Sequence, residues 1–167
     1  MTIFLSEFQP TTKKCSFILN ILLIFIGIAF IIKAFILPST IKEQTANIIF
    51  GCFFLFIYFY FLWTIPIYIE LDKNVLRIKR RFTDKCIPYC LIKDSFMYNE
   101  AQGDIRHFGS NGFMGYFGIM ENTVYGKYHS YVKNPKEQVF IITNNKNYLI
   151  SCNNRELFIE ELKKRTQ

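Results

Sequence analysis

Charged residues are scarce over a long stretch near the N-terminus of this sequence. Residues 16 to 69 number 54, and they contain three charged side chains, Lys33, Lys42 and Glu43. This scarcity excludes a chain that is soluble throughout, because about a hundred residues of basic domain cannot cover two helices that are apolar on all sides. Residues 70 to 167 contain 16 basic and 11 acidic side chains. In the whole chain 51 % of the residues are hydrophobic and 20 % are charged, which excludes a disordered or collagen-like chain.

Two apolar segments within this stretch are long enough to cross a membrane. Residues 16–37 contain one charge, Lys33, and residues 46–69 contain none. As helices they measure about 33 Å and about 36 Å, and a bilayer has a hydrocarbon core of about 30 Å. A cleaved signal peptide is disfavoured, since its apolar run is shorter, roughly 7–15 residues. We therefore predict a transmembrane helical hairpin over residues 16–69, preceded by a tail of residues 1–15.

Basic residues set the expected orientation of this hairpin. Six follow the second segment within residues 70–89: Lys73, Arg77, Lys79, Arg80, Arg81 and Lys85. Lys42 is the only basic residue in the loop between the segments, so the positive-inside rule predicts that the domain and both termini are cytoplasmic. The family resemblance described below implies that this membrane is the inner membrane of a bacterium. Lys79, Arg80 and Arg81 are also candidate contacts for anionic lipid headgroups, although topology alone accounts for them.

The segment from residue 70 to 167 has the pattern of a β-rich domain. Residues 67–79 alternate apolar and polar side chains around Asp72-Lys73-Asn74, which predicts a hairpin whose first strand starts near residue 67. We expect further antiparallel strands at residues 86–92, 95–98, 105–108, 116–120, 127–132, 138–143 and 148–151. Asn153, three residues before Glu156, predicts a capping box that starts a C-terminal helix.

Glycine recurs at every third position from residue 109 to 118, in the sequence FGSNGFMGYFG. One interpretation is a loop that cradles a phosphate group. However, the P-loop needs a Lys-Ser/Thr ending, which is missing here. The alternative is a tight connection between strands that needs positive φ angles and close backbone packing. We favour this structural interpretation.

The arrangement of these elements resembles the bacterial pleckstrin-homology-like domain family, in the form of small proteins whose domain follows two membrane helices. The resemblance implies a bent antiparallel barrel of about seven strands, capped by the C-terminal helix, that serves as a binding or assembly scaffold. Because we count more strand-like runs than seven, the runs 95–98 and 105–108 are in question. The motif that carries the resemblance also supplies the candidate binding or structural loop: Arg106, Phe108, Gly109, Ser110, Gly112, Gly115, Tyr116 and Gly118.

Candidate catalytic residues are weakly supported. Asp104, His107 and Ser110 are spaced by three, but Ser110 lacks the nucleophile-elbow context of a hydrolase. No sequence feature brings His129 and Cys152 together as a nucleophile and its base. We therefore predict no catalytic residues.

Cofactor, metal and nucleic-acid sites are also not expected. Cys86 and Cys90 lack a second pair of zinc ligands. No aromatic and basic residues interleave as they do in a nucleic-acid platform. The expected function is that of a membrane-anchored, non-enzymatic binding or scaffold protein with a protein partner or a second copy of itself. Two alternatives stay open, an anionic-lipid-headgroup-binding module and, with less support, a membrane enzyme.

Overall fold

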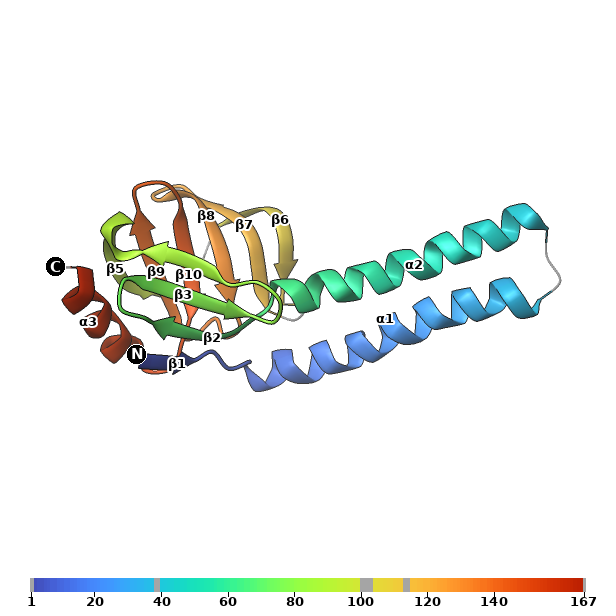
Figure 1. Ribbon diagram of the computed structural model, residues 1–167, viewed down its shortest axis with the longest axis horizontal. Helices are drawn as coiled ribbons and strands as arrows, with labels where there is room; N and C mark the ends of the chain where they lie inside the picture. The colour runs from blue at the N-terminus through green and yellow to red at the C-terminus, as the bar shows by residue number, and fades with distance from the viewer. Residues whose placement is uncertain (1, 38–39, 100–103, 113–114, 167) are drawn as a thin grey trace.

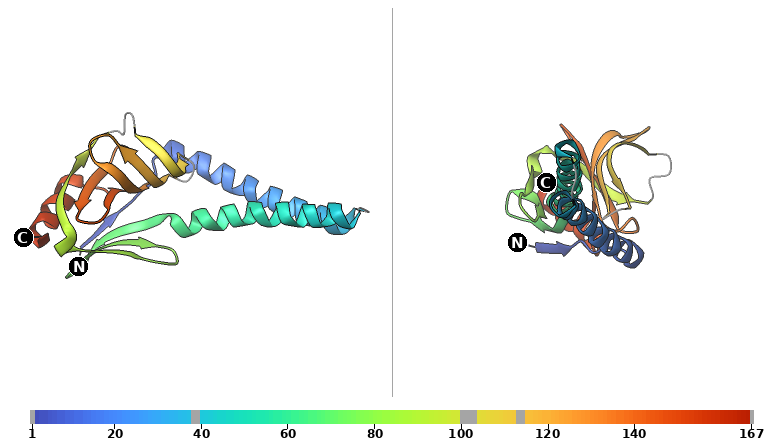
Figure 2. Two further views of the ribbon diagram at one scale, coloured as in Figure 1. Left: turned by 90° about the horizontal axis from the view of Figure 1, so that it is seen from above. Right: turned by 90° about the vertical axis from the view of Figure 1, so that its right-hand side faces the viewer.

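The computed structural model describes residues 2–37, 40–99, 104–112 and 115–166. Two long helices, α1 (Pro10–Ile36) and α2 (Ile41–Thr64), lie side by side as a rod, and a β-rich domain sits at one end of it (Figures 1 and 2). Their apolar side chains are largely uncovered by protein, so neither is the core helix of a soluble domain. Both helices are long and apolar enough to cross a membrane.

The helix boundaries differ from those predicted from hydropathy, and for α2 the local sequence explains both ends. Helix α2 begins at Ile41, because Thr40 and Glu43 form a capping box: the Glu43 amide donates to Thr40 Oγ1, and the Thr40 amide donates to Glu43 Oε2. It ends at Thr64, since Pro66 disfavours a helical backbone at the residue before it. Residues 66–69 of the predicted second span therefore belong to a strand.

The two helices approach closely at a pair of glycines. A Cβ atom on Gly51 would lie 2.9 Å from the carbonyl oxygen of Gly27 and 2.6 Å from the Ile31 side chain. Small residues allow such backbone contact between helices, and in a bilayer this packing takes the place of the hydrophobic effect. The helices thus form one paired unit.

The first sheet has four strands in the order β1-β2-β3-β4. They are β1 (Thr2–Leu5), β2 (Pro66–Leu71), β3 (Val75–Arg80) and β4 (Lys85–Pro88), and the β2–β3 pair confirms the predicted hairpin. The predicted tail, residues 1–15, contains β1 and the start of α1. Strand β1 pairs antiparallel with β2, so the N-terminus is built into the domain that follows the helices.

The second sheet has six strands in the order β5-β9-β10-β8-β7-β6. A short 3-10 helix, Tyr89–Leu91, leads into it. The strands are β5 (Ile92–Tyr98), β6 (Ile105–Asn111), β7 (Tyr116–Asn122), β8 (Gly126–Val132), β9 (Gln138–Thr143) and β10 (Asn147–Ser151). The runs 95–98 and 105–108, which were in question, are parts of β5 and β6.

Three details of the predicted barrel need correction. The described residues form ten strands, against the expected seven or so, partly because β1 gives no signal in the sequence. Strand β10 pairs in parallel with β8, so the sheets are not wholly antiparallel. No strand pairing among the described residues joins the two sheets, so closure into a barrel is not established.

Helix α3 (Arg155–Thr166) closes the end of the domain far from the rod (Figure 1). Phe158 and Leu162 are fully buried in the core between the sheets, and the Phe4 ring packs edge-on against Phe158 at 5.1 Å. The predicted capping box is wrong: α3 starts at Arg155, and the buried Asn153 Oδ1 has no described hydrogen-bond partner.

Candidate functional site

The glycine-rich segment forms the β6–β7 hairpin at one edge of the second sheet. Gly109 lies directly opposite Gly118 in the ladder, with φ angles of +120° and +124°. A Cβ atom on Gly109 would lie 1.8 Å from the Phe117 carbonyl oxygen, and one on Gly118 would lie 2.0 Å from that of Phe108. Only glycine lets these two backbones approach so closely, which supports the structural interpretation.

The other motif residues lie around this glycine pair. The Gly112 amide donates to the Gly115 carbonyl at 3.0 Å and closes the hairpin, and Ser130 Oγ donates to the Tyr116 carbonyl at 2.6 Å. Arg106 and Phe108 are exposed at a bulge in β6, while Ser110 is buried. None of the motif residues lines either of the two cavities described below.

The weak catalytic candidates are held by separate partners. Asp104 accepts hydrogen bonds from Tyr98, Tyr128 and Asn122, and burial raises the pKa of Tyr98 to about 12. His107 pairs instead with Glu121 across the β6–β7 ladder. Asp104 and His107 are therefore bound to different side chains and not to one another, so the described residues do not show the acid–base pair that a triad needs.

The second catalytic candidate also lacks a working geometry. The His129 ring stacks on Tyr148 with a centroid separation of 5.9 Å. Cys152 is fully buried, and burial raises the pKa of its thiol to about 12, so the nucleophilic thiolate is disfavoured at neutral pH. Cys152 therefore acts as a packed core residue.

The predicted lipid-contact residues, at the end of β3 and just after it, have different surroundings. Lys79 Nζ lies 2.8 Å from Asp84 Oδ2, and this hydrogen bond lowers the pKa of Asp84 and occupies the ammonium group. Arg80 donates to the Thr83 carbonyl at 2.9 Å. Arg81 is exposed, and no described residue forms an ion pair with it. Of the three, Arg81 is the cation left open to a ligand.

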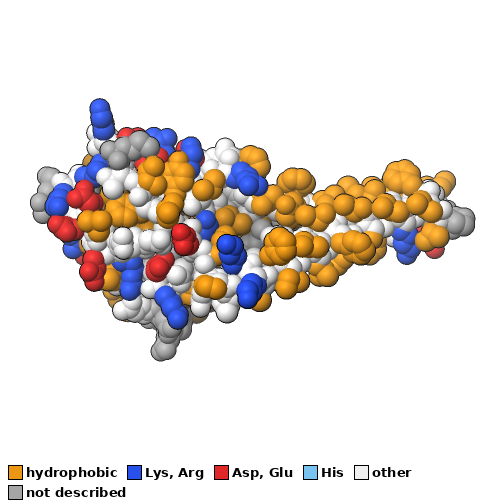
Figure 3. Space-filling view, turned by 90° about the horizontal axis from the view of Figure 1, so that it is seen from below, with side chains coloured by type: hydrophobic (Ala, Val, Ile, Leu, Met, Phe, Trp, Pro, Cys, Tyr) orange, Lys and Arg blue, Asp and Glu red, His pale blue; other side chains and the backbone are white. Residues whose placement is uncertain are grey.

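Arg81 lines a cavity of about 380 Å³ where the helices meet the domain. Figure 3 shows lysine and arginine side chains around this junction, between the apolar rod and the domain. Lys133 also lines it and is 7 % exposed; its Nζ donates to the carbonyls of Ser6 at 2.9 Å and Ile67 at 3.3 Å. Burial lowers the pKa of Lys133 to about 8. Sequence reasoning missed Lys133, since nothing in its local pattern indicates burial.

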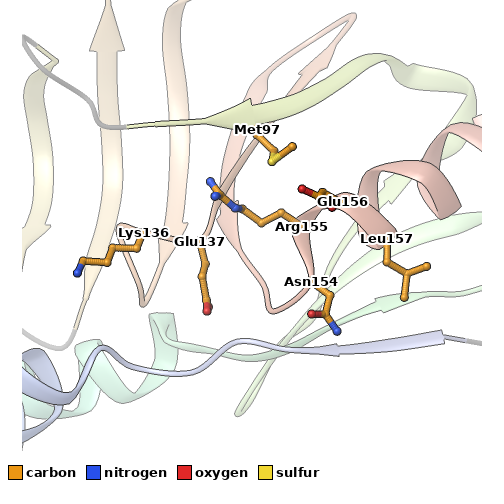
Figure 4. A pocket seen from close by; sticks show the side chains of 7 residues that line it. All are labelled: Met97, Lys136, Glu137, Asn154, Arg155, Glu156 and Leu157. Carbon is orange, nitrogen blue, oxygen red and sulfur yellow. The ribbon is translucent and has the colours of Figure 1, made fainter.

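A second cavity, of about 410 Å³, lies between the turn before β9 and the start of α3 (Figure 4). It is bounded by Met97 of β5, by the start of α3 and by the turn before β9: Met97, Lys136, Glu137, Asn154, Arg155, Glu156 and Leu157. Both signs of charge are present, and the exposed Met97 and Leu157 add apolar surface. Arg155 is oriented by Asn99, whose side-chain oxygen accepts from its guanidinium at 3.0 Å.

The outer edge of β5 is unpaired in the part of the chain that the structure describes. Such an edge presents backbone N–H and C=O groups to an incoming strand. Met97 of β5 lines the cavity described above, so this strand adjoins a cavity with mixed charge and exposed apolar groups. The sequence could not have identified it, because its residues come from three separate segments.

Comparison with protein families supports the fold. The family model described as Bacterial PH domain matches residues 67–166, which start at β2 and end at the last residue of α3. Comparisons with curated proteins and with solved structures found no match. Since the matched residues make up more than half of the chain and the two apolar helices precede them, the chain belongs to the bacterial PH (pleckstrin-homology) domain family.

Proposed function

We propose that this protein is a membrane-anchored, non-enzymatic binding module of the bacterial cytoplasmic membrane. In this proposal α1 and α2 cross the bilayer, and the domain and both termini lie in the cytoplasm. The basic residues that gather at the domain end of the helices support this orientation, because positive charge is retained on the cytoplasmic side. The fold of the family serves as a binding scaffold, but a fold alone does not identify a ligand.

The partner in this proposal is an extended segment of another protein, bound at the β5–α3 cavity. The observation that carries it is the unpaired edge of β5, a strand whose Met97 lines that cavity. A peptide strand added to β5 would supply backbone hydrogen bonds, and Met97 and Leu157 would contact its apolar side chains.

Site-specific photocrosslinking in native membranes tests this function. A photoreactive residue at Met97, which is 42 % exposed, should capture one defined protein partner. The matched control is the same residue at Val124, which is 76 % exposed and lies outside the cavity. A synthetic peptide of the captured segment should then bind the purified full-length protein, and Leu157→Arg should weaken that binding at least tenfold. Equal capture at both positions, capture of a second copy only, or binding unaffected by Leu157→Arg would contradict the proposal.

A further inference from the structure

The cavity at the junction between the rod and the domain combines cationic and apolar walls. Lys13, Arg81 and Lys133 supply three positive charges, and no Asp or Glu lines it among the described residues. Phe17, Leu62 and Ile65 form part of its apolar wall. Excess positive charge in a partly apolar cavity is electrostatically unfavourable unless an anion or solvent compensates it.

Lys133 is placed as a ligand-binding group would be. Its side chain is buried, with 7 % of the residue's surface exposed, and its ammonium lies 5.0 Å from the centroid of the Phe8 ring. Two of its three N–H donors are used by the carbonyls of Ser6 and Ile67. The third remains for a ligand, because no described carboxylate forms an ion pair with Lys133. Glu7, which acts on Lys133 only through its charge, is exposed and does not line the cavity.

The helix side of the cavity carries a polar strip that runs into the bilayer region. Lys13, Ser16 and Asn20 share one face of α1, since they are spaced three and four residues apart. The buried Asn20 Oδ1 has no described hydrogen-bond partner. Asn20 lies about 10 Å deeper along α1 than Lys13, at about 1.5 Å per residue. A polar amide at this depth would lie at the level of the lipid ester groups and the water associated with them.

We propose that this cavity binds one anionic phospholipid molecule, with its phosphodiester between Lys13, Arg81 and Lys133 and its acyl chains along the exposed apolar surface of α1 and α2. A lipid is favoured over free phosphate because the cavity is continuous with helix surfaces that have no protein cover. The inference goes beyond the peptide-binding proposal and does not depend on it. It requires only that the two helices cross the membrane.

Native mass spectrometry of the full-length protein in detergent, with defined lipids added, tests the site. We expect one molecule of phosphatidylglycerol per chain, bound at least tenfold more tightly than phosphatidylethanolamine of the same acyl chains. Inorganic phosphate and glycerol 3-phosphate at millimolar concentration should not displace it. Displacement by either would show that the cavity is a site for soluble phosphate, and equal affinity for both lipids would overturn the proposal.

Variants locate the binding to this cavity. Lys13→Gln combined with Arg81→Gln should weaken phosphatidylglycerol binding at least fivefold, and both side chains are exposed, so folding is preserved. The matched control, Lys73→Gln combined with Lys127→Gln, removes two exposed charges far from the cavity lining and should leave affinity unchanged. Lys133→Met should weaken binding as well. An equal loss of phosphatidylglycerol affinity in the two double variants would show that net charge alone causes the effect, and this would refute a specific site.

Discussion

Replacing Gly118 by alanine tests whether the glycine-rich hairpin is structural. Gly118 has a φ of +124°, and an added Cβ would lie 2.0 Å from the Phe108 carbonyl oxygen, a backbone atom of the paired strand. The strained backbone costs about 1–3 kcal/mol, and the overlap costs about 1–3 kcal/mol more, because β6 must move away from β7. We therefore expect the free energy of unfolding to fall by about 2–6 kcal/mol.

Gly126 provides the matched control for this substitution. It also has a positive φ, +67°, but nothing lies within 4 Å of an added Cβ, so Gly126→Ala should cost about 1 kcal/mol from backbone strain alone. The assay is thermal unfolding of the full-length protein in detergent, since strand β1 precedes α1 and a fragment of residues 70–167 would lack it. Amide hydrogen exchange should show the largest loss of protection in β6 and β7. Equal shifts of the thermal midpoint for the two variants, or lost peptide or lipid binding without lost stability, would refute the structural interpretation.

Three further predictions follow from burial and charge. Phe117 is 2 % exposed, so Phe117→Ala should destabilise the full-length protein by about 3–5 kcal/mol in the same unfolding assay; a change below 1 kcal/mol would place the ring outside the core. Burial lowers the pKa of Lys133 from 10.5 to about 8, so the unfolded chain binds that proton more tightly than the folded protein does. The free energy of unfolding should therefore rise between pH 8 and 10.5. Lys133→Met should abolish most of this rise, and a pH profile unchanged by the substitution would contradict the prediction. A reporter that is active only outside the cytoplasm should be silent when fused after Gln167 and active when inserted near Ser39, and the reverse pattern would overturn the proposed orientation.

Helix and strand positions could be predicted from the sequence where one local signal dominates. The long apolar segments indicated α1 and α2, because a run of this length without charge has few other stable environments. Alternation around Asp72-Lys73-Asn74 indicated the β2–β3 hairpin, which the structure confirms. The exact ends of α2 depend on Thr40, Glu43 and Pro66. The sequence contains these signals, but the prediction placed the ends by hydropathy instead.

The glycine spacing indicated close backbone contact but not which residues meet. The structure pairs Gly109 with Gly118 across the β6–β7 hairpin. The spacing of the glycines does not predict this register. In the same way, β1 is four residues long and gains its stability from pairing with β2, more than sixty residues later. A strand of this kind is stabilised by its partner, not by its own propensity.

The sequence by itself determined the division into an apolar hairpin and a basic, β-rich domain, because composition and periodicity are local properties. The PH type of that domain was indicated by a resemblance in the glycine-rich motif and the C-terminal elements. Only the tertiary structure decided which separate segments meet at each cavity. It buried Lys133 beside Lys13 and Arg81, which lie more than fifty residues apart in each case, and it left the edge of β5 open next to α3. Charge, burial and an unpaired edge at a site depend on distances between segments, and these distances exist only once the chain has folded.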